Sequence, residues 1–477
     1  MESIWSQSCK IEKREPLREN RKVEAAVIGA GMAGVLTAYE LQEAGVNVVI
    51  LEADRIAGGQ TKNTTAKITS QHGLIYHRLL EKLGKERARQ YAMANEAAIG
   101  EYRRIIEKEG IACDLEEKSS CIYSDSEEIL KREAGTALEL GLPASFIHDI
   151  PLSLSCVGAV RFDRQAQFHP LKFIREVSDR LEIYENTPVR RMEGNTLLTD
   201  EYRVEAERVI FACHYPFLNF PGLYFARMHQ ERSCVLALEH AAQVDGMYLG
   251  EGKEKYSFRN YGSLLLMGGE NYRTGEDREG NHFRRLREKA VQLFPTCREI
   301  ACWSAQDCMT LDEVPYIGHY SARRQDWYAA TGFNKWGMTT SMVSAMLIKD
   351  SICGIDNPAA AVFAPDRFAV GDIPPMAAQG KQAVKGLLRR SFTIPGEKAE
   401  KLEKGQGKIV LLEGKKTGVY RDMDGKLYAV DVRCPHLGCQ LEWNPEERSW
   451  DCPCHGSRFD YQGRLIDNPA QEGISFE

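Results

Sequence analysis

Two cysteines and two histidines near the C-terminus have the residue types and the spacing of a metal-ligand set. Cys434 and His436 form a Cys-x-His pair, and 15 residues separate it from the Cys-x-x-His pair of Cys452 and His455. Two thiolates on one iron and two imidazoles on the other would hold a [2Fe-2S] cluster. A Cys2His2 zinc site uses the same residue types, but zinc fingers usually place the cysteines and the histidines in separate pairs. The pattern therefore favours an iron-sulfur centre that moves electrons, with zinc as the alternative.

Two further cysteines, Cys439 and Cys454, occupy matching places in the two loops, where they could bridge them. The segment CPHLGCQLEWNPEERSWDCPCH resembles Rieske proteins of the cytochrome bc type, and the resemblance implies a disulfide between these two residues. In those relatives a serine and a tyrosine after the second histidine hydrogen-bond the cluster. Here the sequence continues as Gly456, Ser457, Arg458 and Phe459, so the serine is kept and the tyrosine is lost. Because fewer hydrogen bonds leave the reduced cluster less stabilised, we expect a reduction potential below that of the respiratory centres.

The N-terminal region carries a second and independent pattern, in which an apolar strand, a Gly-x-Gly-x-x-Gly turn, a helix and a second strand follow one another. Gly29 permits the tight turn, Gly31 lets the backbone approach a pyrophosphate, and Gly34 allows close helix packing. The N-terminus of the helix offers free N–H groups to the anion. Glu52, 23 residues beyond Gly29, ends the second strand, where a carboxylate can bind a ribose. The pattern predicts a dinucleotide-binding βαβ unit.

Two later stretches indicate which dinucleotide is bound. The stretches WSAQDCMTLDEVPYIG at 303–318 and WYAATGFNKWGMTTS at 327–341 resemble the D-amino-acid oxidase or glycine oxidase superfamily of FAD enzymes. The resemblance implies FAD as the cofactor and a helix N-terminus facing the flavin pyrimidine, where its positive end stabilises negative charge on the reduced ring. The resemblance assigns Gly332, Gly337, Met338 and Thr339 to this turn and helix. It assigns Gly59 and Thr61 to the loop that approaches the phosphates, here called the phosphate loop. It assigns Val189 to the contact with the adenine.

The substrate pocket departs from the amino-acid oxidases at one position. Where those enzymes place an arginine against the substrate carboxylate, alignment on Trp303 and Asp312 puts Asp307 in this chain. A desolvated Arg-carboxylate pair is strongly favourable, and reversing the charge would repel an anion. We therefore hypothesise a cationic amine substrate without a free carboxylate at this point. The alternative is that Asp307 is solvated or paired with an arginine such as Arg259. Arg259 and Tyr261 are candidates for lining the pocket, or else ordinary residues of a sheet surface.

Composition excludes several classes of function. The net charge of −6 gives no reason to expect nucleic-acid binding. The sequence contains no run of about 18 apolar residues and no apolar signal region at its start, so we expect neither a membrane span nor a signal peptide, and a cytoplasmic location. His72 and His77 have the spacing of an iron site in Rieske oxygenases, but no acidic residue stands at the usual distance. Core or flavin-loop histidines are the favoured interpretation.

The predicted fold is an α/β FAD-binding Rossmann-like domain with an α+β substrate domain, followed by an all-β Rieske domain at the C-terminus. The chain of 477 residues is long enough for about three domains. A basic helical stretch in the linker is predicted near KQAVKGLLRRS, and a hairpin turn at Asp424 and Gly425. Pro469 lies where Rieske domains carry a loop over the cluster. The expected parts are a polar, loose tail at 1–22, an FAD-dependent oxidoreductase at 23–355 (FAD-binding pieces 23–75, 155–220 and 300–355; substrate-domain insertions 76–154 and 221–299), a linker at 356–404 and a Rieske domain at 405–477.

The predicted function joins the two redox groups. We expect FAD to oxidise a small amine-type substrate at a C–N bond and the Rieske [2Fe-2S] cluster to take the electrons singly to an external redox protein or acceptor, because flavins exchange one or two electrons and the cluster only one. Electron flow from an external reductase to the flavin is equally compatible with the sequence. A second hypothesis is an electron carrier or redox sensor without its own substrate. A Rieske oxygenase is disfavoured because an iron triad is missing.

Overall fold

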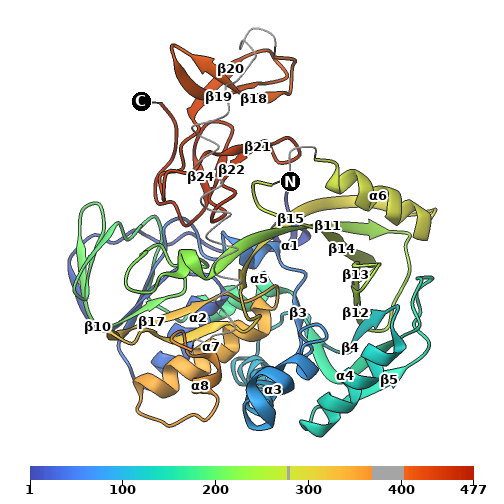
Figure 1. Cartoon of the computed structure of the whole chain (residues 1–477). Coiled ribbons are helices and arrows are strands. Elements are labelled where there is room, and N and C mark those ends of the chain that lie inside the picture. The colour runs from blue at the N-terminus through green and yellow to red at the C-terminus, as the bar shows by residue number, and fades with distance from the viewer. Residues whose placement is uncertain (277–279, 368–401, 477) are drawn as a thin grey trace.

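The computed structural model of the chain describes residues 1–276, 280–367 and 402–476, and Figure 1 shows it as a large lower body with a small β domain above it. The first sheet of the body is mainly parallel, and the C-terminal halves of its central strands are continuously buried, as expected where strands are covered on both faces. Its strands, in spatial order, are β16 (Tyr316–Ser321), β17 (Arg324–Thr331), β10 (Arg203–Phe211), β1 (Arg21–Ile28), β2 (Val48–Leu51) and β7 (Ile183–Tyr184), with β8 (Arg191–Glu193) and β9 (Thr196–Leu198) beside β10.

Helices α2 (Met32–Glu43) and α7 (Gly337–Ile352) pack side by side against this sheet (Figure 1). Both are almost wholly buried, which fits their lack of a polar face. The N-terminus of α2 follows β1, and the N-terminus of α7 follows β17. Because β1 and β17 run parallel through β10, the two helices begin at the same edge of the sheet. Helices α5 (Pro170–Ser178) and α8 (Ala360–Phe363) complete this part.

The second sheet is mostly antiparallel and forms the wall of the predicted substrate domain. In spatial order it contains β15 (Arg298–Thr310), β11 (Met228–Glu239), β14 (Leu264–Arg273), β13 (Ser257–Tyr261), β12 (Met247–Glu251), β4 (Glu116–Ser124), β6 (Gly158–Gln167) and β3 (Lys67–Ile68), with β5 (Ala144–Ile147) beside β6. The predicted piece boundaries are wrong at three points, the first of which is β3, which lies inside the expected FAD piece 23–75 but pairs with β6 in the second sheet. Strand β6 lies inside the expected FAD piece 155–220, and β15 lies almost entirely inside the piece 300–355, yet both pair within the second sheet because their partners are β4 and β11.

The predicted helical insertion after residue 76 is present as α3 (Tyr76–Glu109) and α4 (Glu127–Glu139). A break at Gly84, whose φ is 78°, divides α3. Helix α6 (His282–Leu293) lies along the second sheet, and short 3-10 turns occur at η1 (Gln60–Asn63) and η2 (Tyr224–Ala226). No helix in the described ranges is long and apolar enough to cross a membrane.

The expectation of a loose N-terminal tail is wrong. Residues Ile4–Ser8 form helix α1, and the Trp5 side chain is fully buried. Its indole N–H donates to the carbonyl oxygen of Thr64 at 2.7 Å, and its ring packs edge-on against His169 and Tyr261. Burial of the large indole ring with its only donor satisfied stabilises this contact and holds the N-terminal helix in place.

The C-terminal domain is built from two small antiparallel sheets, seen at the top of Figure 1. The first contains β18 (Gly407–Leu412), β19 (Lys415–Arg421) and β20 (Leu427–Asp431), and the second contains β21 (Glu442–Asn444), β22 (Ser449–Asp451), β23 (Arg458–Asp460) and β24 (Leu465–Asp467). The hairpin between β19 and β20 turns at Asp424 and Gly425, where glycine has a φ of 93°. The helix predicted near KQAVKGLLRRS lies outside the described residues.

Candidate active site and iron-sulfur centre

One cavity with a volume of about 980 Å³ lies where the two sheets and the C-terminal domain meet. This volume is large enough to hold a dinucleotide site and a substrate site together, because it lies at the upper end of the range of about 300 to 1,000 Å³ that is typical of ligand pockets. Residues of the C-terminal domain between Leu465 and Gln471 form part of its wall. The predicted cofactor residues that line it are Gly29, Gly31, Glu52, Gly59, Thr61, Val189, Gly332, Gly337 and Met338.

The turn after β1 requires glycine at two of its positions. Gly29 has a φ of 104°, and a Cβ there would lie 2.8 Å from the carbonyl oxygen of Ala212. Gly34 does not line the cavity; a Cβ on it would lie 1.9 Å from the carbonyl oxygen of Gly29, which is the close helix packing predicted for this glycine. Gly31, the N-cap residue of α2, has no side chain to cap the helix, and the Thr61 hydroxyl accepts from Met32 N–H at 3.0 Å. The first turn of α2 therefore presents its positive end to the cavity.

Glu52 follows β2 and reaches back to the glycine turn. Its carboxylate accepts hydrogen bonds from the backbone N–H of Ala30 at 2.7 Å and of Asp54 at 2.9 Å. Burial raises the pKa of Glu52, and these two hydrogen bonds act in the opposite direction. A carboxylate has four acceptor positions, so two remain for the hydroxyl groups of a ribose. The glycine turn, the end of α2 and Glu52 fit the dinucleotide half of FAD.

The start of α7 supplies a second helix N-terminus at the cavity. Gly337 and Met338 line it, and no described side chain caps the helix at Trp336. Thr339 does not line the cavity, because its hydroxyl donates to the carbonyl oxygen of Thr69 at 2.9 Å and accepts from the N–H of the same residue at 2.8 Å. Thr339 thus ties α7 to the loop after η1, and the donor groups of Gly337 and Met338 remain at the cavity, where they fit a flavin ring.

Strands β11 and β15 form the wall that carries Asp307. Glu231 pairs directly across from Asp307 in the antiparallel register, so the two carboxylates share one face. Both line the cavity together with Lys335, whose ammonium lies 2.9 Å from Glu231. Burial raises the pKa of Asp307 to about 6, whereas the hydrogen bond with His229 lowers the pKa of Glu231 to about 2. At neutral pH this wall carries two carboxylates and one ammonium.

Two of the three predicted catalytic candidates, Arg259 and Tyr261, do not line the cavity that contains Asp307. Arg259 is buried outside the cavity, where its guanidinium donates to the carbonyl oxygens of Thr65 and Ala66 at 3.0 and 2.6 Å. Tyr261 donates its hydroxyl to Asp114 at 2.8 Å. The prediction that these residues line the pocket is wrong, and so is the alternative that Arg259 pairs with Asp307. Both side chains point from β13 toward the buried N-terminal segment, which a sequence pattern cannot place.

His72 also lies at the cavity, but both of its ring nitrogens are already bonded. One lies 2.7 Å from the Tyr91 hydroxyl and the other 2.8 Å from the carbonyl oxygen of Thr69. Burial lowers the pKa of His72 to about 3, so the ring is neutral. His77 faces Glu81 at 3.2 Å. These partners fit the expected structural histidines of the flavin loop and do not fit an iron site.

The two Cys/His loops of the C-terminal domain come together as the sequence predicted. The thiols of Cys434 and Cys452 are buried and interact with each other, and the rings of His436 and His455 have centroids 4.8 Å apart. Both Nδ1 atoms of these histidines are buried without a hydrogen-bond partner in the described structure. Burial lowers the pKa of His436 to about 4 and that of His455 to about 3, so both imidazoles are neutral. Two thiols and two neutral, unpartnered ring nitrogens fit a [2Fe-2S] cluster.

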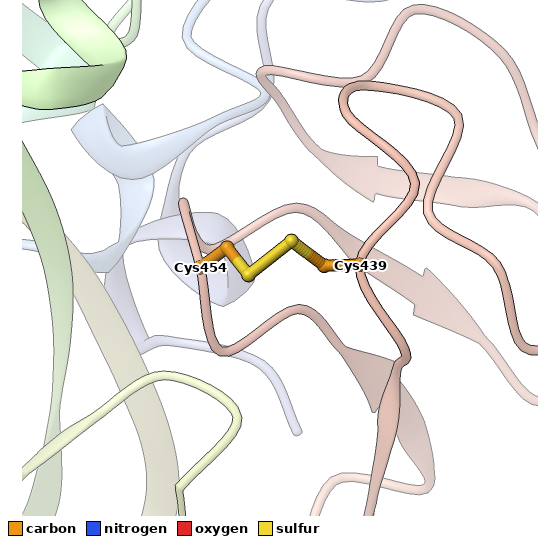
Figure 2. The surroundings of a disulfide bond; sticks show 2 residues. All are labelled: Cys439 and Cys454. Carbon is orange, nitrogen blue, oxygen red and sulfur yellow. A yellow bond between two sulfur atoms is a disulfide. The ribbon is translucent and has the colours of Figure 1, made fainter. Parts of the chain in front are cut away.

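A disulfide joins the two loops at the positions that the resemblance implied. Figure 2 shows the Cys439–Cys454 bond between them, with 15 residues of separation along the chain. The sulfurs of Cys439, Cys452 and Cys454 lie within 4.8 Å of one another, so the disulfide borders the ligand pocket directly. Its two sulfurs are bonded to each other, which leaves Cys452 as the thiol of this group for a metal. Ser457, behind the second loop, accepts from the N–H of Ala470 at 3.0 Å.

The fold and the two sites define a flavoprotein oxidoreductase joined to an iron-sulfur domain. Comparison with family profiles agrees, since residues 24–351 match the profile described as FAD dependent oxidoreductase (DAO) and residues 394–476 match the Rieske [2Fe-2S] domain. The chain belongs to the DAO family of FAD-dependent oxidoreductases and carries a C-terminal Rieske domain. The predicted fold class and both predicted cofactors, FAD and the [2Fe-2S] cluster, are thereby confirmed.

Curated relatives share either the whole chain or the Rieske part. YhfW of Bacillus subtilis (strain 168) is named as a Rieske 2Fe-2S iron-sulfur protein and is 34% identical to this chain over 488 residues. The match covers 98% of this chain and 96% of YhfW. The cytochrome b6-f complex iron-sulfur subunit of Synechococcus sp. (strain RCC307) is 33% identical over 102 residues, which are 20% of this chain and 57% of that protein.

Solved structures share the fold of the larger part. Glycine oxidase from Geobacillus kaustophilus superimposes with a TM-score of 0.62 at 18% identity, covering 73% of this chain and all of that one. L-proline dehydrogenase from P. horikoshii gives a TM-score of 0.61 at 17% identity, and the match covers 74% of this chain and 99% of the dehydrogenase. At these identities the likeness shows the fold alone.

Proposed function

We propose that this chain is a dehydrogenase that oxidises a small cationic amine at a C–N bond and passes the electrons through its own Rieske cluster to an external acceptor. The observation that carries the proposal is the cavity itself. Its wall combines the FAD-binding residues, the Glu231–Asp307 pair and the segment Leu465–Gln471 of the Rieske domain. A substrate bound there would lie between the flavin site and the domain that holds the cluster.

The charge of the wall favours a cation. Lys335 is already paired with Glu231 at 2.9 Å, whereas Asp307 has no hydrogen bond or ion pair within residues 1–276, 280–367 and 402–476. Its pKa of about 6 leaves it ionised at neutral pH. A free carboxylate in a partly desolvated site attracts an ammonium group and repels a second carboxylate. The expected substrate therefore carries a protonated amine and no carboxylate near Asp307.

The chain's own residues would bind and orient the amine. Asp307 would accept hydrogen bonds from the ammonium group, and Glu231 with Lys335 would hold the neighbouring wall fixed. FAD, when bound, would supply the acceptor for a hydride equivalent from the C–H next to nitrogen once the ammonium group has given up one proton, which Asp307 is placed to accept. The N-terminus of α7 at Gly337 and Met338 would stabilise the negative charge that the reduced ring gains.

Proteins of similar fold support a C–N substrate in general terms. Their names describe a glycine oxidase, an L-proline dehydrogenase and an L-amino acid deaminase from Proteus vulgaris, so each acts on a compound with a C–N bond. The presence of an iron-sulfur domain in the same chain favours electron transfer over direct reaction with oxygen, since a linked cluster stays at high effective concentration.

The test is an anaerobic titration of the purified protein with a panel of amines and amino acids. We expect a cationic amine to bleach the flavin spectrum and then to raise the EPR signal of the reduced cluster, whereas amino acids bind weakly. Tight binding of carboxylates to the native protein would refute the cationic substrate. If no compound bleaches the flavin and only an external reductase produces the cluster signal, the electron carrier or the reverse direction of flow is correct.

A further inference from the structure

The wall formed by β11 and β15 has a second face, which points to the Rieske domain. Alternation along β11 puts His229, Glu231 and Ser233 on one side and Gln230 and Arg232 on the other. In β15 the residue directly across from Arg232 is Gln306. Gln230, Arg232 and Gln306 are long polar side chains that are at most 2% exposed. Buried polar groups of this size need partners, and the structure shows that many of them come from the cluster loops.

Gln230 joins the cavity to the cluster site. Its amide nitrogen donates to the carbonyl oxygen of His455 at 2.7 Å and to that of Asn468 at 3.0 Å. Its amide oxygen lies 3.1 Å from Nε2 of His214, a residue that lines the cavity. A single side chain thus connects a histidine at the flavin cavity with the backbone of a predicted cluster ligand.

The hydrogen-bond directions along this connection follow from its partners. Because the amide nitrogen of Gln230 faces two carbonyl oxygens, the orientation of the amide is fixed. Its oxygen must then accept, both from Gln306 Nε2 at 2.6 Å and from His214. His214 therefore carries its proton on Nε2, which makes the path His214 to Gln230 to His455 a continuous chain of hydrogen bonds.

The side chain of Gln230 is packed tightly against the second cluster loop. A Cβ on Gly456, which follows His455, would lie 2.6 Å from Cβ of Gln230. Gln306 donates to the carbonyl oxygen of Gly456 at 2.9 Å and accepts from Thr274 at 3.1 Å. Strand β11 and the second cluster loop are therefore in direct contact, and the contact requires glycine at 456.

A buried ionic network holds the same two surfaces together. Arg232 donates from Nε to Glu447 at 2.8 Å, and Arg458 bonds Glu447 at 2.8 Å and Asp467 at 3.1 Å. The two arginines hold the pKa of Glu447 down to about 2 against the effect of burial. Gln60 of the predicted phosphate loop donates to Asp467 at 2.7 Å. The network therefore links the predicted phosphate loop, β11 and the Rieske domain.

We propose that Gln230 is a positioning residue of a fixed electron-transfer junction: it couples the flavin cavity at His214 to the cluster ligand His455, while the Arg232 network keeps the Rieske domain docked. The inference rests on electron exchange between the two cofactors and not on the nature of the substrate. It gives the domain contact a role in electron transfer beyond holding two folded parts together.

The step at this junction is a transfer of single electrons. With both cofactors bound, one electron would pass from the two-electron-reduced flavin to the cluster, whose two ferric ions would become one ferric and one ferrous ion. An external one-electron acceptor must reoxidise the cluster before the second electron follows. After both electrons and one proton, released to solvent, have left, the flavin is fully oxidised again.

The test uses light instead of a substrate. The flavin of the complete protein is photoreduced anaerobically by a short pulse, and reduction of the cluster is followed optically, with EPR and the midpoint potential of the cluster as independent readouts. The variant is Gln230→Met, which keeps the length and removes both hydrogen-bonding groups. The matched control is Gln243→Met, because Gln243 is an exposed glutamine of the same domain that donates to the carbonyl oxygen of Ser263.

We expect Gln230→Met to slow cluster reduction by about tenfold, since small displacements of reacting partners cost at least that much. The cluster potential should fall, because a donor beside a ligand is lost. Gln243→Met should change neither. If Gln230→Met loses its cluster, the transfer rate of Gln230→Glu decides, since this variant keeps the length and the acceptor and loses the two donated bonds, while its added carboxylate would by itself lower the potential. A native rate and a native potential in the decisive variant would overturn the proposal, and this result is independent of whether any amine is oxidised.

Discussion

The two redox sites of this chain are assembled in different ways. All four predicted ligands of the cluster come from two loops between Cys434 and His455, and a disulfide joins those loops. The cavity draws its lining from positions as far apart as Ile28 and Gln471 and from two sheets and the Rieske domain. A site made of short loops is specified by local spacing, whereas a site made of distant strands depends on how the whole chain folds.

The largest expected effect concerns the local site. Cys452→Ser removes one of two thiolates, and an iron-sulfur cluster does not tolerate such a loss. We expect the EPR signal of the reduced cluster to disappear while the flavin spectrum is unchanged. The control is Cys353→Ser, because Cys353 is an exposed cysteine away from the loops. Loss of FAD together with iron would show that the two sites are not separately specified.

The second prediction concerns the distant site. Gly29→Ala places a methyl group 2.8 Å from the carbonyl oxygen of Ala212, in a backbone conformation that costs alanine about 1 kcal/mol. Gly45→Ala is the matched control, because Gly45 also has a positive φ but no atom within 4 Å of the new methyl group. We expect the first variant to be purified without FAD and the second to keep it, as measured by flavin absorbance per protein. Equal flavin content in both would argue against the close contact at Gly29.

The contrast also explains what the sequence could and could not predict. The glycine turn, Glu52 and the Cys/His loops follow from spacing alone, because each uses residues that are close in sequence. Arg259 was misplaced because its partners, the carbonyl oxygens of Thr65 and Ala66, lie almost 200 positions away. The buried tail around Trp5 was missed for the same reason, since its partners lie at Thr64 and His169.

The junction residues were missed although the sequence holds a signal for them. In MHQERSCVLALE, Gln230 and Arg232 share a period-two face with Met228 and Cys234, so two polar residues interrupt an apolar stripe. Such an interruption indicates a buried polar contact, but it does not name the partner. The partner is a domain that begins more than 150 residues later.

The third prediction concerns the junction between the two regions. Arg232→Met leaves Glu447 with Arg458 as its remaining buried cation, and breaking a buried ion pair costs about 3 kcal/mol. We expect faster hydrogen exchange in β11 and in the second cluster loop, and a lower unfolding temperature. The control is Arg287→Met, which breaks a more exposed pair with Glu299 and should change stability by less than about 0.5 kcal/mol. Equal effects of the two variants would mean that the network does not hold the domains together.

The smallest expected effect is the pH dependence of substrate binding. Asp307 must be ionised to bind an ammonium group, and its pKa of about 6 means that its charge is lost as the pH falls through 6. Glu231, with a pKa of about 2, stays ionised in this range. The KM for a cationic amine should rise about tenfold for each pH unit below 6, and Asp307→Asn should have a high KM without this pH step. An unchanged pH profile in the variant would remove Asp307 from the binding site.

The central claim is that flavin and cluster form one electron-transfer unit within a single chain. The most direct measurement is the rate of cluster reduction after pulsed photoreduction of the flavin, recorded anaerobically over a tenfold range of protein concentration. Transfer across a permanently docked junction predicts a rate constant that does not change with concentration. A rate that rises in proportion to concentration would show that electrons pass between separate molecules, and it would contradict the account.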